Sequence, residues 1–138
     1  MQPPAPDGLP GVGFDLVDVD RFRLAMERNG DRFRQRVFTP HEQSECDGRA
    51  DPILHYAARF AAKEAGMKAL GTGWSGGVGF RDFEVHSDGR HPPRLVLHGK
   101  AAEVAEHHGL RGLRVSLSHT TRSAGAAVVA VPGPPAAV

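Results

Sequence analysis

The chain has 138 residues, 40% of them hydrophobic and 24% charged, and its 17 Lys and Arg against 16 Asp and Glu give a formal net charge of +1. This mixture is too apolar for a disordered chain and too polar for a membrane bundle, and the length fits one domain with its own core. A net charge near zero argues against bulk nucleic-acid binding, which depends on a large positive field.

Three further features narrow the setting of the protein. No apolar run approaches the ~20 residues that span a bilayer, so we expect no transmembrane helix. The first residues lack a basic start followed by an apolar stretch, so we expect no signal peptide. The single cysteine, Cys46, excludes an intramolecular disulfide and a zinc site built on several cysteines. Together these features favour a cytoplasmic protein.

Both ends of the chain are rich in proline. Residues 1–10 contain four prolines, and residues 132–138 consist of Pro-Gly-Pro-Pro followed by small residues. Such segments bury little surface. We therefore expect a flexible N-terminus over residues 1–10, one folded domain over residues 11–131 and a flexible tail over residues 132–138.

The first elements follow from alternation and capping. Residues 11–19 alternate in polarity and predict a strand, with Asp15 on the face opposite Phe14 and Leu16. Asp20 is the expected N-cap of a helix over residues 21–29, which Gly30 would end. Thr39 and Asp51 each precede a proline, and this pattern starts a helix.

The second of these helices is the clearest element in the chain. It spans residues 52–70, is dominated by alanine and ends at Gly71. The elements expected after it are strands 81–86 and 94–98, a short helix 101–108, and paired strands 113–118 and 124–131. The predicted fold is α+β: a mostly antiparallel sheet packed against one long helix and shorter helices.

Two acids stand out because their surroundings are apolar. Asp15 lies in an apolar strand, and Glu64 lies among the alanines of the long helix. A buried charge needs a partner, and two carboxylates from a strand and a helix suit a hard cation such as Mg²⁺. The alternative is that each acid pairs with a nearby Arg or Lys at the surface.

The same helix carries cations that precede a glycine-rich loop. Arg59, Lys63 and Lys68 lie on adjacent stripes, and Gly71 and Gly73 follow. Cations beside glycines suit phosphate groups, because glycines let backbone amides approach a ligand closely. The alternative is a solvated face with weak ion pairs, in which Glu64 would bond to Lys68 four residues later.

Polar residues end one of the last strands, at Ser118, His119 and Thr120. Adjacent strand residues point to opposite faces, so Ser118 and His119 form a poor nucleophile–base pair. They are better suited to hydrogen bonding with a nucleotide or phosphate, and ordinary turn residues are the alternative.

A run of arginines occupies residues 21–36. Six arginines fall in these 16 positions, with only two acids, Glu27 and Asp31, after the first of them. The run predicts either a solvated helix face or a docking surface for an acidic partner.

The order of these motifs, more than any one of them, is specific. The chain closely resembles the holo-acyl-carrier-protein synthase family, the short type of phosphopantetheinyl transferase, over residues 11–131. The motifs that carry the resemblance are Gly11-Val12-Gly13-Phe14-Asp15, Arg59-Phe60-Ala61-Ala62-Lys63-Glu64-Ala65 and Ser116-Leu117-Ser118-His119-Thr120.

The resemblance implies roles for individual residues. Asp15 and Glu64 match the two protein ligands of Mg²⁺, and Lys68 matches a lysine that contacts coenzyme A phosphate at the reacting centre. Positions that match the lining of the coenzyme A site are Arg59, Lys63, Lys68, Gly71, Gly73, Ser118, His119 and Thr120. Residues that match the docking site for the acidic carrier protein are Arg21, Arg32, Phe33 and Arg36.

The resemblance also implies an activity and an assembly. The expected reaction is Mg-dependent transfer of phosphopantetheine from coenzyme A to a serine of an apo acyl carrier protein, releasing adenosine 3′,5′-bisphosphate. A carrier of fatty-acid or of polyketide biosynthesis fits, and the family forms homotrimers with active sites between subunits.

The alternatives to this function are a non-catalytic coenzyme A-binding module and a small basic-patch nucleic-acid binder. One departure from the family is the turn over residues 89–93, which is one residue longer than the family's Gly-Lys-Pro turn and puts its adenine contacts in doubt.

Overall fold

The computed structural model describes residues 11–72 and 77–134. Its elements run β1 (Val12–Asp18), α1 (Val19–Val37), α2 (Pro40–Asp47), α3 (Pro52–Leu70), η2 (Phe80–Asp82), β2 (Phe83–His86), β3 (Arg94–Leu97), α4 (Gly99–His107), β4 (Leu110–His119) and β5 (Ser123–Pro132). These elements confirm the predicted α+β class. The expected flexible ends lie mostly outside the described residues.

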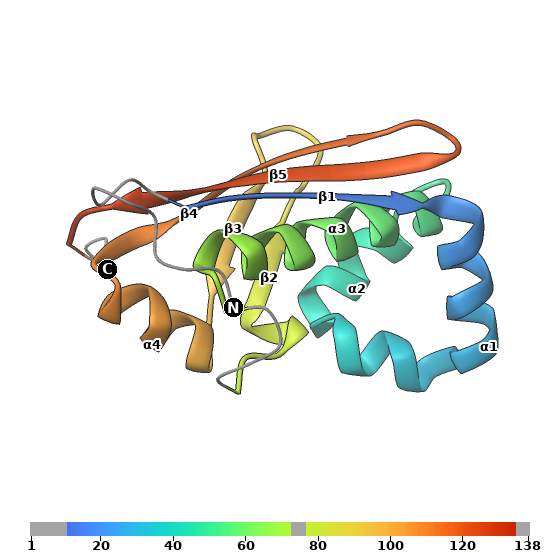
Figure 1. Ribbon diagram of the computed structural model, residues 1–138. Coiled ribbons are helices and arrows are strands. Elements are labelled where there is room, and N and C mark those ends of the chain that lie inside the picture. The colour runs from blue at the N-terminus through green and yellow to red at the C-terminus, as the bar shows by residue number, and fades with distance from the viewer. Residues whose placement is uncertain (1–10, 73–76, 135–138) are drawn as a thin grey trace.

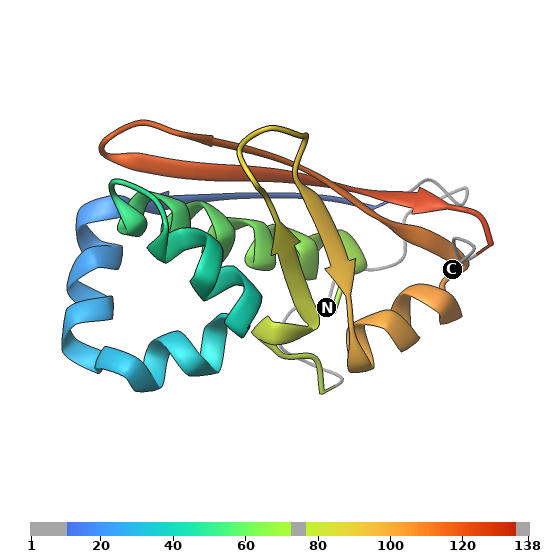
Figure 2. The same ribbon diagram turned by 180° about the vertical axis from the view of Figure 1, so that it is seen from behind.

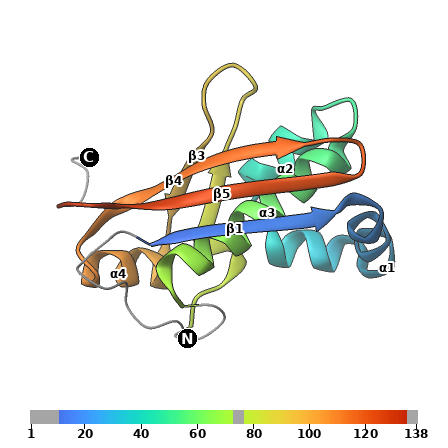
Figure 3. The ribbon, with the colours of Figure 1, turned by 45° about the horizontal axis from the view of Figure 1, so that its top comes forward.

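The five strands form one antiparallel sheet in the order β1-β5-β4-β3-β2. Strands β1, β5 and β4 lie side by side as a long layer, and α3 runs along one face of it (Figures 1 and 3). Strands β3 and β4 pair only at Leu95 and Leu113, so the β2–β3 hairpin diverges from the long layer (Figure 2).

The small residues of α3 bring β1 very close to it. A Cβ atom at Gly13 would collide with the backbone oxygen of Ala65, and one at Gly11 with that of Ala69. Because glycine has no side chain, β1 can approach the backbone of α3 directly. Asp15 lies two residues after Gly13, on the same face of β1, so this contact also places Asp15 beside the helix.

The hydrophobic core has two parts that share α3. One lies between α3, α4 and the sheet, and includes Phe83, Val85 and Val128. The other lies between α1, α2 and α3, and includes Phe22, Phe38 and Tyr56. Helix α3 therefore anchors the sheet on one side and the two N-terminal helices on the other.

The start and end of α1 differ from the prediction. Asp18, rather than Asp20, is the N-cap, because its side chain accepts a hydrogen bond from the backbone N–H of Arg21. Gly30 has a positive φ of 56° with a non-helical ψ of −143°, so the first helical segment ends there, as predicted. A second helical segment, which was not predicted, follows this kink directly and continues to Val37.

Other predicted boundaries are confirmed to within a few residues. Helix α2 begins with a capping box between Thr39 and Glu42, with Pro40 in its first turn. Helix α3 ends at Gly71 in the left-handed conformation, as expected. No helix among residues 11–72 and 77–134 is long and apolar enough to cross a membrane.

Candidate functional site

The predicted pair of acids is brought together where β1 meets α3. Asp15 lies on the inner face of β1, with its side chain 15% exposed, and Lys68 of α3 donates to its Oδ1 across 3.2 Å. The same ammonium donates to the backbone oxygen of Phe14 across 2.9 Å. Lys68 therefore pairs with Asp15 on the strand instead of Glu64 on its own helix.

Glu64 completes this cluster. Partial burial and the negative charge of Asp15 raise the pKa of Glu64, and the positive charge of Lys68 opposes that shift. Within residues 11–72 and 77–134 no hydrogen bond or ion pair engages the Glu64 carboxylate. The two carboxylates carry two negative charges and Lys68 supplies one positive charge, so the cluster keeps a net negative charge that favours binding of a cation.

The donor set of the cluster fits magnesium better than zinc. No group of three or more His, Cys, Asp or Glu in the described part of the chain is placed to hold a metal. Magnesium in proteins is typically held by one or two carboxylates, with water and substrate phosphates completing its octahedron. Asp15 and Glu64 can therefore hold Mg²⁺ once a phosphorylated substrate supplies further oxygens.

Lys63 and Arg59 are placed differently from the sequence expectation. Lys63 is completely buried, and its ammonium donates to Glu42 Oε1 at 2.7 Å and to the backbone oxygens of Phe83 and Phe80 at 2.7 and 3.1 Å. These bonds use all three of its donors. A direct contact with coenzyme A is therefore not open to Lys63 in this structure, and neither is the solvated face given as the alternative.

Arg59 is also buried but lies beneath a cleft. Its guanidinium donates to Glu45 Oε1 at 3.0 Å and to the backbone oxygen of Ser87 at 3.1 Å. Its Nε atom is buried and has no partner within the described residues. Glu45 and Ser87 both line the cleft above it, so Arg59 contributes positive charge to the cleft floor.

This cleft has a volume of about 910 Å³ and lies between the β2–β3 hairpin and β4, where the sheet diverges. Its lining carries the basic side chains His41, His86, His91, Arg94 and Arg114, together with the acids Glu45 and Asp88. Sequence reasoning missed these residues, because they come from α2, both hairpin strands, the turn between those strands and β4. The lengthened turn over residues 89–93 lies at its edge and contributes His91, Pro92 and Pro93.

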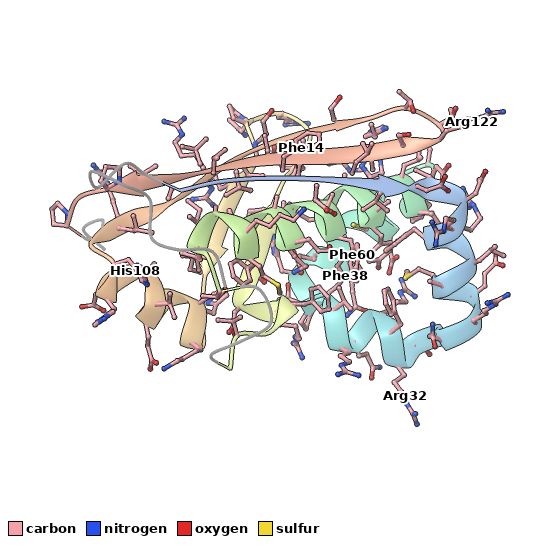
Figure 4. All side chains as sticks on the ribbon, viewed as in Figure 1. Phe14, Arg32, Phe38, Phe60, His108 and Arg122 are labelled. Atoms are coloured by element: carbon pink, nitrogen blue, oxygen red, sulfur yellow. The ribbon has the colours of Figure 1, made fainter. Side chains whose placement is uncertain are left out.

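The polar end of β4 lines a second hollow, of about 330 Å³, on the outer face of the sheet. Ser118, His119 and Thr120 meet Phe14 and Leu16 there. Figure 4 shows Phe14 on the side of the sheet away from the helices. In a single chain Ser118 is thus separated by the sheet from Asp15 and Glu64, which face α3. The ring of His119 instead turns toward α3, with 5.4 Å between its centroid and that of His55.

The remaining predicted residues fall in two places. Gly71 caps α3 near Lys68, and Gly73 lies outside the described residues. Arg21, Arg32 and Arg36 are exposed on α1, and Phe33 packs inward between Phe22 and Phe60. Figure 4 shows Arg32 extending outward from the second half of α1.

Comparison with known proteins gives a consistent result. A family model described as the 4'-phosphopantetheinyl transferase superfamily matches residues 11–128. A holo-[acyl-carrier-protein] synthase from Solibacter usitatus is 49% identical over 110 residues, which cover 80% of this chain and 88% of that protein.

Solved structures agree with the sequence relatives. The crystal structure of holo-[acyl-carrier-protein] synthase from Neisseria meningitidis matches with a TM-score of 0.80 and 33% identity, covering 88% of this chain and 98% of that one. The enzyme from Helicobacter pylori in complex with coenzyme A matches with a TM-score of 0.72 and 28% identity, covering 86% and 98%.

Proposed function

The chain belongs to the 4'-phosphopantetheinyl transferase superfamily, and we propose that it transfers phosphopantetheine from coenzyme A to an acyl carrier protein with Mg²⁺ bound by Asp15 and Glu64. It is an enzyme of the holo-[acyl-carrier-protein] synthase type. The observation that carries the proposed mechanism is the cluster of Asp15, Glu64 and Lys68 at the contact of β1 with α3.

The reaction is a displacement at phosphorus. The carrier serine oxygen attacks the pyrophosphate phosphorus next to the pantetheine, and the bond from that phosphorus to the bridging oxygen breaks. Adenosine 3′,5′-bisphosphate leaves with the bridging oxygen. When bound, Mg²⁺ offsets negative charge that develops on the pyrophosphate oxygens.

The chain's own residues supply the other roles. Lys68, held by Asp15 and the Phe14 carbonyl, places a fixed positive charge beside the leaving group. Glu64 is the proposed acceptor of the serine proton, because its carboxylate lies in this cluster and is not engaged by other described residues.

The coenzyme A phosphates need cationic partners, and the cleft between the hairpin and β4 offers two arginines. Arg94 and Arg114 line the cleft and Arg59 lies below it. Oxygen anions of phosphate are well matched to arginine. We assign the cleft to the nucleotide end of coenzyme A, and the exposed arginines of α1 to the acidic carrier.

The proposed assembly is a homotrimer. Val12, Phe14 and Leu16 of β1 are 68%, 60% and 63% exposed, and Val129 beside Val12 is 46% exposed. A contiguous apolar face of this kind is typical of an interface. A second copy on this face would also bring its residues near Ser118–Thr120, which share the outer hollow with Phe14 and Leu16. Action in the cytoplasm stays a prediction from the sequence.

One experiment tests the reaction and separates it from its rivals. The protein is incubated with coenzyme A, Mg²⁺ and an apo carrier protein, and the carrier is weighed by mass spectrometry. We expect the carrier to gain one phosphopantetheine group, whereas a binding module or a nucleic-acid binder leaves its mass unchanged. Near-normal transfer by both Asp15→Ala and Glu64→Ala in saturating Mg²⁺ would overturn the mechanism. Glu103→Ala, which removes an exposed acid on α4, is the matched control and should transfer normally.

A further inference from the structure

Helix α1 is divided at Gly30, which has φ of 56° and ψ of −143°. A residue with these angles does not continue an α-helix, so the direction of residues 31–37 is not set by the first half of α1. This second half carries the exposed Arg32 and Arg36. Contacts elsewhere must therefore determine where these two cations point.

A hydrogen-bonded cluster of three side chains, here called the Arg34 clamp, joins this segment to the next two helices. Arg34 Nη2 donates to Asp47 Oδ1 of α2 at 2.6 Å and to the Tyr56 hydroxyl of α3 at 2.7 Å. The Tyr56 hydroxyl in turn donates to Asp47 Oδ1 at 2.8 Å. Each member thus contacts the other two.

Tyr56 gives the clamp a rigid base. It is 1% exposed, and its ring packs edge-on against Phe38 with 4.8 Å between centroids. Burial raises the pKa of Tyr56 to about 12, so the hydroxyl stays protonated and donates a hydrogen bond to Asp47. The guanidinium carbon of Arg34 lies 5.1 Å from the centre of the same ring, within the range of a cation–π interaction.

The clamp determines the direction of its neighbours on the helix. Residues two apart on an α-helix differ by about 200° in direction. With Arg34 turned inward, Arg32 and Arg36 must both project outward, and neither forms an ion pair with any other described residue. Phe33 supports the same rotation by packing against Phe22 and Phe60 at 6.0 and 6.2 Å between centroids.

We propose that the Arg34 clamp is a positioning device for the carrier-docking surface: it fixes the rotation of residues 31–37 so that Arg32 and Arg36 together face an acidic partner protein. The inference rests on the proposed function and adds residues that the docking surface itself does not contain. Arg34, Asp47 and Tyr56 act through Arg32 and Arg36 and touch neither coenzyme A nor the reacting atoms.

The test compares the KM values for carrier and for coenzyme A in the full-length enzyme. Tyr56→Phe removes only a hydroxyl, and Asp47→Asn changes a side chain that is half exposed. Each variant should raise the carrier KM about fivefold, which is the effect expected when one exposed charge pair with the carrier is lost. Each should leave kcat and the coenzyme A KM unchanged. Lys100→Met removes a cation from α4, at the other end of the molecule (Figure 1), and should change neither KM.

A double-mutant cycle separates positioning from general stability. In an Arg32→Ala/Arg36→Ala background, Tyr56→Phe should have no further effect on the carrier KM, because the cations that it positions are gone. High salt should also reduce the difference between Tyr56→Phe and wild type, since exposed charges are then screened.

The possible outcomes are distinguishable. If the wild-type enzyme transfers no phosphopantetheine, the proposed function is wrong. If it does, the clamp proposal is overturned by unchanged carrier KM values in both variants, by equal rises in the two KM values, or by an effect of Tyr56→Phe that persists in the Arg32→Ala/Arg36→Ala background.

Discussion

Lys63 Nζ lies 2.7 Å from Glu42 Oε1, and both side chains are completely buried. Glu42 also accepts the backbone N–H groups of Thr39 and Val85 at 2.9 and 2.8 Å, and the other two Lys63 protons go to backbone oxygens. Charges removed from water remain ionised only when they are compensated this fully. The pair joins α2, α3 and β2 beside the cleft, and its role is structural.

Removing one member of this pair should strongly destabilise the fold. Lys63→Met leaves the Glu42 carboxylate buried without its cation, so we expect the free energy of unfolding to fall by about 3–5 kcal/mol in urea titrations. Adding Glu42→Gln removes the stranded charge and should recover part of the loss. Lys100→Met, which breaks an exposed pair with Glu103, should cost less than about 1 kcal/mol. A Lys63→Met protein as stable as that control would contradict the buried pair.

The close approach of β1 to α3 gives a second prediction. Gly13→Ala places a methyl group against the Ala65 carbonyl, which cannot move without shifting α3, so we expect a loss of about 1–3 kcal/mol or more. Because the same contact holds Asp15 beside Glu64, transfer should fall even where the variant is folded. Gly112→Ala is the matched control, since a Cβ there meets no atom within 4 Å. Equal stability and activity of the two variants, checked by thermal melting and the mass assay, would disprove this account.

The sequence predicts elements well where the signals are local. Alternation places Asp15 opposite Phe14, and a proline start and glycine end delimit α3. The second half of α1 was missed, because its stability comes from contacts of Phe33 and Arg34 with later helices. Helix periodicity likewise cannot show that Lys63 is buried.

The candidate site was predicted only in part, because some of its features depend on local sequence signals and others on contacts between distant segments. The motifs identify Asp15, Glu64 and Lys68, and strand alternation and helix position bring them together. The cleft was not predictable, because it forms where the pairing of β3 with β4 stops after a single residue pair. No local pattern in the sequence shows where strands diverge.

The apolar outer face of β1 predicts an oligomer that depends on it. Phe14→Ser with Leu16→Ser removes two large exposed apolar side chains, and neither belongs to the core of a single chain. We expect the wild type to behave as a trimer in light scattering and the double variant as a monomer with unchanged secondary structure by circular dichroism. If active sites lie between subunits, transfer should fall with the trimer. A fully active monomer would refute the interface.

The raised pKa of Glu64 predicts that the Glu64→Gln substitution increases stability and decreases activity. Its pKa is raised in the folded state, so ionising it costs stability; the cost is absent below the unfolded pKa near 4.5 and fully present above the folded pKa. Glu64→Gln should therefore melt above the wild type at pH 7.5 and level with it at pH 4, while transfer falls about 100-fold or more.

Mg²⁺ provides a separate readout of the same carboxylates. A cation between Asp15 and Glu64 relieves their repulsion, so Mg²⁺ should raise the melting temperature of the wild type more than that of Glu64→Gln. Glu103→Gln alters an exposed acid on α4 and should show neither the pH-dependent gain nor a loss of the Mg²⁺ effect. If Glu64→Gln melts below the wild type at pH 7.5, or if both gain equally from Mg²⁺, then Glu64 is stabilised by contacts within the chain and does not contribute to a cation site.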